Sequence, residues 1–115
     1  MPPTCVFCRI VNGKEDADLI YQDDQLTAFH DLHPQAPVHV LIVPNRHISS
    51  VNKVTEADAS LMGHMLLLAQ KLVADLEIAQ RGYRLVINTG RDGGQSVDHV
   101  HLHLLGGRRM HWPPG

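Results

Sequence analysis

Three histidines occupy alternate positions of an otherwise apolar segment in this 115-residue chain, His99-Val100-His101-Leu102-His103-Leu104-Leu105. A period of two is typical of a half-buried β-strand, so the apolar residues are expected to face a core and the imidazoles the opposite side. A strand rises about 3.3 Å per residue, which spaces successive rings of this set by roughly 6 to 7 Å. The segment therefore predicts a strand over 99–105 that presents two imidazoles at once to one phosphate or one metal ion.

The composition restricts the classes of partner. The formal net charge is −2 and the acidic and basic residues are interspersed, so the chain lacks the basic field of a protein that binds duplex nucleic acid. Its apolar stretches are far too short to span a membrane, and no charged and then apolar leader opens the sequence. We expect a cytoplasmic protein that forms one domain over residues 1–115, with neither duplex nucleic acid nor a membrane as its partner.

Turn residues divide the chain into short elements. A turn or short helix is expected over 5–11, and a long helix is predicted from Thr55 until Arg81-Gly82, because its apolar residues recur with helical spacing. The loop 89–98 would join the last two strands. The expected strands are 18–22, 26–30, 38–43, 83–88 and 99–105. The prediction is an α+β fold, in which a mainly antiparallel five-stranded sheet packs against one long helix.

The loop that precedes the histidine segment is rich in glycine. Gly93-Gly94 permits backbone conformations that turn successive N–H groups toward one point, and Ser96 can add a hydroxyl. Such a loop binds an anion without lysines. The simpler interpretation is a hairpin loop that uses glycine only to turn. Because three histidines follow directly, we favour the anion-binding loop.

Two separated blocks and the last residues resemble a known family. Gly93-Gly94-Gln95-Ser96-Val97, followed by His-Val-His-Leu-His-Leu-Leu, is similar to the signature of the histidine triad (HIT) superfamily. The ending over 106–115 resembles its nucleotide-binding phosphoramidase branch. Other residues that fit this branch are Phe29-His30-Asp31, Pro34-Gln35-Ala36-Pro37, His39, Pro44 and His47. The resemblance implies a HIT-like fold and a homodimer that binds purine nucleoside monophosphates. It also implies a hydrolase that cleaves the P–N bond of purine nucleoside 5'-phosphoramidates and needs no cofactor for catalysis.

The resemblance also assigns catalytic roles. His101 would be the nucleophile, and its attack at phosphorus would give a nucleotidyl-histidine intermediate that water then hydrolyses. His103 would lie against the phosphate, while His39 and His99 would complete the catalytic histidines together with the hydroxyl of Ser96. A backbone carbonyl that holds the proton on one ring nitrogen of His101 would fix the tautomer that attacks.

Substrate contacts follow from the same resemblance. Asp31 would accept hydrogen bonds from both ribose hydroxyls, and Trp112 would approach the partner's site in the dimer. Phosphate oxygens would meet donors placed where charge accumulates in the transition state, namely Asn88, Gly94, Gln95 and Ser96. The base would lie in a mostly apolar slot formed by Val6, Phe7, Ile10, Phe29, His30 and Leu32.

The segment Cys5-Val6-Phe7-Cys8 offers two thiolates at the spacing of a metal knuckle, which is half of a tetrahedral site. In related superfamily enzymes, such cysteines are joined by a histidine after the third strand and by the first histidine of the terminal motif, here His47 and His99. Two interpretations stay open. Cys5, Cys8, His47 and His99 hold a structural zinc ion, or the cysteines are buried free thiols in a reducing compartment.

Two other functions compete with phosphoramidate hydrolysis. Dinucleoside polyphosphate hydrolases share the three histidines, although the ending over 106–115 favours the phosphoramidase branch. The non-enzyme alternative is an adaptor or sensor that binds nucleotide with little turnover. Hydrolysis of an adenosine phosphoramidate, compared with that of a diadenosine polyphosphate, discriminates among the three.

Overall fold

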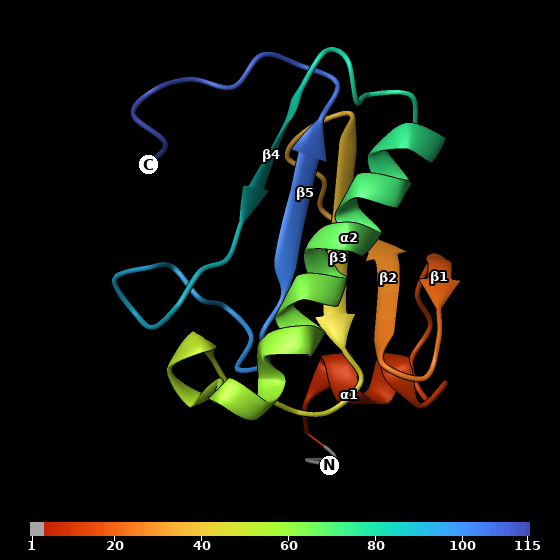
Figure 1. Ribbon diagram of the computed structural model, residues 1–115, viewed down its shortest axis with the longest axis vertical. Helices are drawn as coiled ribbons and strands as arrows, with labels where there is room; N and C mark the ends of the chain where they lie inside the picture. Colours follow the sequence, from red (N-terminus) through yellow and green to blue (C-terminus); the bar gives the residue numbers. More distant parts are fainter. Residues whose placement is uncertain (1–3) are drawn as a thin grey trace.

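One antiparallel sheet forms the centre of the protein in the computed structural model, which describes residues 4–115 (Figure 1). The strands pair in the order β1-β2-β3-β5-β4, and every neighbouring pair is antiparallel. Their bounds are β1 (Leu19–Gln22), β2 (Leu26–His30), β3 (Val38–Pro44), β4 (Tyr83–Val86) and β5 (Leu102–Gly106). The α+β class with a five-stranded antiparallel sheet is therefore confirmed.

Helices cover both faces of this sheet. The long helix α2 (Ala59–Asp75) packs on one face, and the short helix α1 (Val6–Val11) packs on the other. Alternation in β3 separates the two layers, because Val40 and Ile42 belong to the core beneath α2, whereas Leu41 and Val43 pack with α1. The central strand β3 is thus buried on both faces, which explains its continuous apolar run from Val40 to Val43.

Two 3-10 turns, η1 (Val51–Lys53) and η2 (Glu56–Asp58), connect β3 to α2. Thr55 precedes the second turn as expected, and its N–H and hydroxyl both contact the Asp58 carboxylate, at 2.9 and 3.3 Å. Asp58 also forms an ion pair with Arg46. Together these contacts anchor the start of the helical segment.

The long helix ends earlier than predicted, at Asp75 rather than at Arg81-Gly82. Glu77 adopts a left-handed φ of 62°, and the Ile78 N–H donates to the Val73 carbonyl at 3.0 Å. This hydrogen bond closes the helix end in the way that a C-terminal glycine usually does. Ile78 then turns back into the core, where it is 6% exposed. The prediction was wrong because a glutamate occupies the position at which glycine gives the usual signal.

The last strand begins at Leu102 rather than at His99, since its ladder with β3 starts at the Ile42–Leu102 pair. Before it, the Val100 N–H donates to Ile48 outside the sheet. The predicted alternation still holds, because Val100, Leu102 and Leu104 are buried in the core beneath α2. The histidine rings meet Phe7 and each other on the α1 side. The strand expected over 83–88 likewise ends at Val86, opposite His103.

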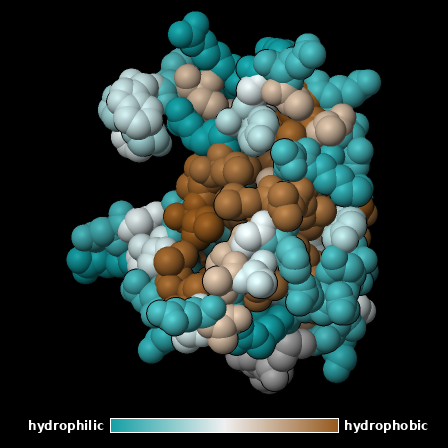
Figure 2. Space-filling model, in the orientation of Figure 1, coloured by the Kyte–Doolittle hydropathy of each residue, from teal (hydrophilic) through white to brown (hydrophobic). Residues whose placement is uncertain are grey.

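The outer surface of α2 is strongly apolar. Figure 2 shows apolar side chains gathered over this helix, and Leu66 and Leu67 are 55% and 61% exposed. The neighbouring edge strand β4 adds Tyr83, which is 39% exposed. Within residues 4–115, no helix is both long enough and apolar enough to cross a membrane.

Candidate functional site

A cavity of about 260 Å³ opens on the face of the sheet that carries α1 and the histidines. Its wall contains the predicted nucleophile, its neighbour in the triad, the serine of the glycine loop and the acidic residue after β2, which are His101, His103, Ser96 and Asp31. Every residue expected to form the apolar slot also lines it, namely Val6, Phe7, Ile10, Phe29, His30 and Leu32. Segments far apart in the sequence thus converge on one apolar hollow that holds imidazoles.

The remaining lining residues were not predicted: Asp16, Ala17, His33, Leu41 and Val97. Asp16 and Ala17 lie in the connection between α1 and β1, where no periodic pattern points to a site. Leu41 lies in β3, whose continuous apolar run does not distinguish its two faces. Two residues carried a usable signal. Val97 ends the glycine-rich motif that resembles the family, and His33 lies between Asp31 and Pro34 in the other matching segment.

His101 is held in one orientation at the cavity wall. It is 3% exposed, and its ring meets Phe7 edge to face with centroids 5.0 Å apart. Its Nδ1 atom lies 2.7 Å from the carbonyl oxygen of His99. Because a carbonyl oxygen only accepts, Nδ1 carries the proton and the neutral ring has its lone pair on Nε2. Across residues 4–115 nothing hydrogen-bonds that Nε2 atom.

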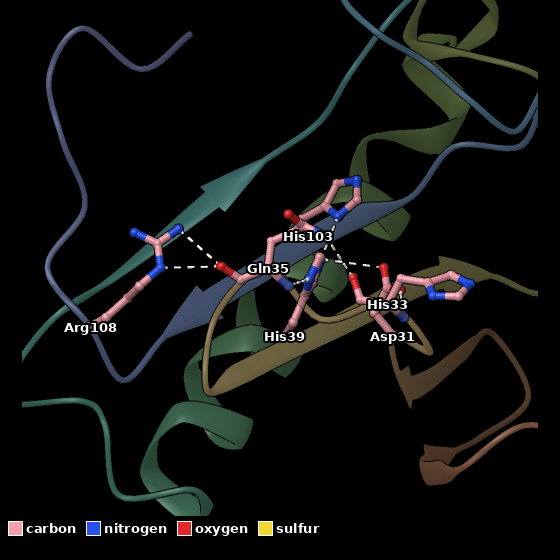
Figure 3. Close-up of polar contacts among 6 residues, drawn as sticks. All are labelled: Asp31, His33, Gln35, His39, His103 and Arg108. Carbon is pink, nitrogen blue, oxygen red and sulfur yellow. Dashed lines mark hydrogen bonds and ion pairs between the residues drawn. The ribbon is translucent and has the colours of Figure 1, made fainter.

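His39 and His103 form a hydrogen-bonded relay (Figure 3), and the centroid of the His103 ring lies 4.9 Å from that of His101. The Nε2 atom of His39 lies 2.9 Å from Nδ1 of His103. The Gln35 N–H donates to Nδ1 of His39 at 3.0 Å. A neutral His39 therefore carries its proton on Nε2 and donates to His103, which in turn holds its own proton on Nε2. The structure thus directs one ring lone pair, from His101, and one ring N–H, from His103, at the same cavity.

Burial keeps the relay neutral. The pKa of His103 is lowered from the ordinary 6.5 to about 4, chiefly by burial and then by the neighbouring His101 and His39. Burial also lowers the pKa of His39, although the nearby Asp31 carboxylate opposes this effect. The Oδ2 atom of Asp31 lies 3.4 Å from Nε2 of His39. Both rings of the relay are therefore neutral at pH 7.

The glycine loop is organised differently from expectation. The N–H groups of Gly94 and Gln95 donate to carbonyls within the loop, on Arg91 and Gly90, at 3.1 and 3.0 Å. Gly94 has a φ of 77°, which favours glycine. The Asn88 amide donates to Gly93 at 2.7 Å. These residues hold the loop in shape but do not line the cavity, whereas Ser96 does.

Ser96 is the loop residue that brings a polar side chain to the cavity wall. Among residues 4–115, no partner hydrogen-bonds its hydroxyl, which lies in the wall of the cavity. Trp112, by contrast, is 82% exposed and does not line the cavity of its own chain. The Arg84 guanidinium holds the tail by donating to the His111 carbonyl at 2.8 Å.

Cys5, Cys8, His47 and His99 form a compact cluster beside this cavity, with ligand atoms within 4.8 Å of one another. The Cys5 and Cys8 sulfurs lie 3.4 and 3.6 Å from Nδ1 of His99. The Cys8 sulfur lies 3.3 Å from Nδ1 of His47, and the two Nδ1 atoms are 3.2 Å apart. A tetrahedral zinc ion with ordinary bond lengths places its ligand atoms about 3.3 to 3.8 Å apart. The donor set and its spacing fit such an ion.

A hydrogen bond to His99 and the burial of Cys8 both favour the binding of a metal ion by the cluster. Nε2 of His99 lies 2.8 Å from the Pro44 carbonyl, so it carries the proton and leaves the lone pair of Nδ1 for a metal. The pKa of Cys8 is raised to about 11, by burial and by the adjacent Cys5. The Cys8 thiol therefore resists ionisation unless a cation compensates its charge. The cluster can therefore hold a metal ion, with His99 as a ligand rather than a residue of the cavity.

Asp31, His39 and His103 also bring metal-binding atom types within 4.8 Å of one another. However, the Gln35 N–H keeps the proton of His39 on Nε2, the atom that a metal would need. The 2.9 Å separation of the two rings is that of an ordinary hydrogen bond. We therefore interpret these residues as a hydrogen-bonded relay and not as a metal site.

Residues 12–110 match the HIT domain family, and the chain belongs to this family. An uncharacterised HIT-like protein of Synechococcus elongatus is 47% identical over 115 residues, which is the whole of both chains. Among solved structures, a HIT family hydrolase from Legionella pneumophila matches with a TM-score of 0.96 and 46% identity, over 97% of this chain and 100% of that one. A histidine triad nucleotide-binding protein from Candida albicans matches with a TM-score of 0.81 and 28% identity, over 96% and 83% of the two chains.

Proposed function

We propose that this protein hydrolyses purine nucleoside 5'-phosphoramidates through a nucleotidyl intermediate on His101. The observation that carries the proposal is the hydrogen bond from Nδ1 of His101 to the His99 carbonyl, which leaves the opposite ring nitrogen unprotonated and without a partner among residues 4–115. Membership of the HIT family supports a hydrolase. The names of its structural relatives, a hydrolase and a nucleotide-binding protein, agree with this class.

In the first step, the lone pair on Nε2 of His101 attacks phosphorus and the P–N bond breaks, with its electrons going to nitrogen. The departing amine takes up one proton, for which the Ser96 hydroxyl and the Nε2–H of His103 are the nearby donors. The phosphorylated ring of His101 becomes cationic, and the His99 carbonyl that accepts its Nδ1–H stabilises that charge. In the second step, water attacks phosphorus and His101 leaves as the neutral ring. The proton that the water loses restores the donor that protonated the amine.

The rest of the cavity fits a nucleoside. Its apolar walls, which include Phe7, Phe29 and Leu32, suit the faces of a purine ring. Asp31 supplies a carboxylate at the polar end, where Oδ1 accepts the His33 N–H at 2.8 Å. Its remaining lone pairs are available to ribose hydroxyls. The Ser96 hydroxyl and the His103 N–H are positioned as donors to phosphoryl oxygens.

We further propose that the Cys5, Cys8, His47 and His99 cluster holds a structural zinc ion. The ion would stabilise the N-terminal segment against the strand that carries the histidines, and it would supply no chemistry to the phosphoryl group. The second ring nitrogen of His99, on the Pro44 carbonyl, already has the arrangement that zinc-binding histidines prefer. Catalysis by His101 requires no cofactor under this proposal.

A homodimer is also part of the proposal. Leu66 of α2 is 55% exposed, and Ile87, which follows the edge strand β4, is 39% exposed. Exposed apolar side chains together with an unpaired sheet edge are typical of a subunit interface. Light scattering at micromolar concentration should give twice the mass of one chain, and Leu66→Glu should lower the measured mass to that of a single chain. Asn12→Asp, on the α1 side, should leave the dimer intact. A monomeric mass for the unaltered protein would exclude it.

The experiment that tests the function compares two substrates at equal concentration. Adenosine 5'-phosphoramidate should be hydrolysed to AMP and ammonia, and a diadenosine polyphosphate should be hydrolysed far more slowly. Preferential cleavage of the polyphosphate would favour the dinucleoside polyphosphate hydrolases. Tight AMP binding with no cleavage of either compound would favour the adaptor or sensor, and each of these results contradicts the proposal.

A further inference from the structure

Arg108 contacts a loop that is 73 residues away in the sequence and lies next to the catalytic histidines (Figure 3). Its Nε and Nη2 atoms both donate to the backbone carbonyl oxygen of Gln35, at 3.1 and 3.0 Å. Its third nitrogen, Nη1, donates to the Arg109 carbonyl at 3.0 Å. The guanidinium is thus held by three hydrogen bonds, two of which converge on one peptide of the loop.

The chain conformation after β5 brings Arg108 to this loop. Gly107 has a φ of 87°, and a Cβ atom at that position would lie 2.9 Å from Cβ of Pro37. Only glycine allows the chain to cross Pro37 this closely. The crossing sets the next residue, Arg108, beside the Gln35 carbonyl. The pairing therefore depends on backbone geometry and not on a flexible side chain reaching across solvent.

The loop that Arg108 holds is the one that sets the tautomer of His39. Gln35 offers its carbonyl to Arg108 and its N–H to Nδ1 of His39, the latter at 3.0 Å. The N–H makes Nδ1 an acceptor, so His39 donates from Nε2 to His103. If the loop shifted, His39 could hold its proton on Nδ1 instead, and His103 would present a lone pair rather than an N–H to the phosphate.

We propose that Arg108 is a positioning residue, whose guanidinium fixes the Gln35 backbone and thereby the His39 tautomer that keeps His103 a proton donor. This inference rests on the proposed function, because it concerns the same relay during P–N cleavage. Arg108 does not line the cavity. Its neighbour Arg109 has the same charge and is also exposed, but its side chain makes no hydrogen bond within residues 4–115. Arg109 therefore provides a matched control.

The first test is kinetic. In the full-length protein, Arg108→Ala should lower kcat for adenosine 5'-phosphoramidate by about three- to tenfold, the range expected for the loss of ordinary hydrogen bonds. KM should stay within about twofold, since no substrate contact is lost. Arg108→Lys, with one cationic donor instead of the planar fork, should restore part of the rate. Arg109→Ala should match the unaltered protein. An equal loss in Arg109→Ala, or a change in KM alone, would overturn the inference.

The second test asks whether Arg108 acts through His39. In a His39→Gln background, Arg108→Ala should cause no further loss of kcat, because the group that it positions is gone. Independent losses that multiply would contradict the inference.

Nitrogen-15 NMR of the histidine rings gives a readout that does not depend on turnover. The unaltered protein should show His39 protonated on Nε2, and Arg108→Ala should raise the fraction protonated on Nδ1. An unchanged His39 tautomer in Arg108→Ala would overturn the inference even if the rate fell. If the unaltered protein failed to cleave the phosphoramidate, the proposed function would fall, while this spectrum would still decide whether Arg108 positions His39.

Discussion

The carbonyl oxygen of His99 accepts a hydrogen bond from Nδ1 of His101 at 2.7 Å, while the ring of His99 belongs to the cluster with Cys5 and Cys8. One residue thus joins the two halves of the site. Groups that hold the His99 ring also restrict the His99 backbone. The carbonyl of that backbone sets the tautomer of His101. The cluster can therefore influence His101, the proposed nucleophile, although the residues of the cluster do not line the cavity.

The first prediction concerns the metal. Protein purified without a histidine tag should contain about one zinc ion per chain, and Cys8→Ser should lose it and lower Tm by about 10 °C or more. Turnover should fall as well, because the His99 backbone that orients His101 is loosened. His111→Gln, which alters an exposed histidine outside the cluster, should change neither quantity. If no metal binds even after reconstitution under reducing conditions, the cysteines are packing residues only.

Ser96→Ala should separate catalysis from stability. The hydroxyl lies in the cavity wall without a partner among residues 4–115, so its removal should leave Tm nearly unchanged. Loss of one donor to the phosphoryl group should lower kcat by about ten- to a thousandfold. Asn88→Ala is the useful comparison, since the Asn88 amide braces the loop through Gly93. A variant Ser96→Ala with normal kcat would remove this residue from the mechanism.

Asp31 should determine the preference for ribonucleotides. Calorimetry should show that Asp31→Ala weakens AMP binding by about tenfold or more, the cost of losing hydrogen bonds to a charged group, with little effect on dAMP. Asp31→Asn retains an oxygen that can accept the His33 N–H. This variant therefore separates the loss of the negative charge from the loss of that hydrogen bond. Asp16→Ala removes the other carboxylate of the cavity and should keep the preference. If Asp31→Ala weakened the binding of AMP and dAMP equally, Asp31 would serve only to hold the backbone through the His33 N–H.

The neutral relay predicts a specific dependence of stability on pH. In the folded protein the pKa of His103 is about 4, below its ordinary 6.5. Between these values the unfolded chain binds a proton that the folded protein does not, so the free energy of unfolding falls as the pH falls from about 6.5 to about 4. His103→Asn keeps an acceptor for His39 and should show a shallower fall of Tm with pH. Identical slopes for the two proteins would contradict the lowered pKa.

The layers of the fold could be predicted from the sequence, because apolar residues recur with the period of a helix or a strand wherever such an element packs on the core. Alternation in the segment 99–105 placed Val100 and Leu104 in the core and His101 on the opposite face, as observed. The boundaries were less predictable. The helix α2 ends where Glu77 turns left-handed. The strand β5 begins only at Leu102, because the Val100 N–H donates to the Ile48 carbonyl outside the sheet. Neither event has a local sequence signal.

The family resemblance predicted most residues of the candidate site, but it did not predict the hydrogen bonds that hold these residues in place. The resemblance placed Asp31, Ser96 and His103 in one cavity, where the structure has them. It also assigned Gly94 to the phosphate, whereas the Gly94 N–H bonds within its own loop. The contact of Arg108 with Gln35 was not predictable, because a backbone carbonyl carries no sequence signal.

The central claim is that His101 forms a covalent bond to the nucleotide, and rapid quenching followed by peptide mass spectrometry tests it most directly. The unaltered protein, mixed with adenosine 5'-phosphoramidate and quenched during turnover, should carry one adenylyl group on the peptide that contains His101. His101→Ala should carry none, and its turnover should be lower by several orders of magnitude while AMP still binds. An adenylyl group on another residue, or near-normal hydrolysis by His101→Ala, would contradict the account.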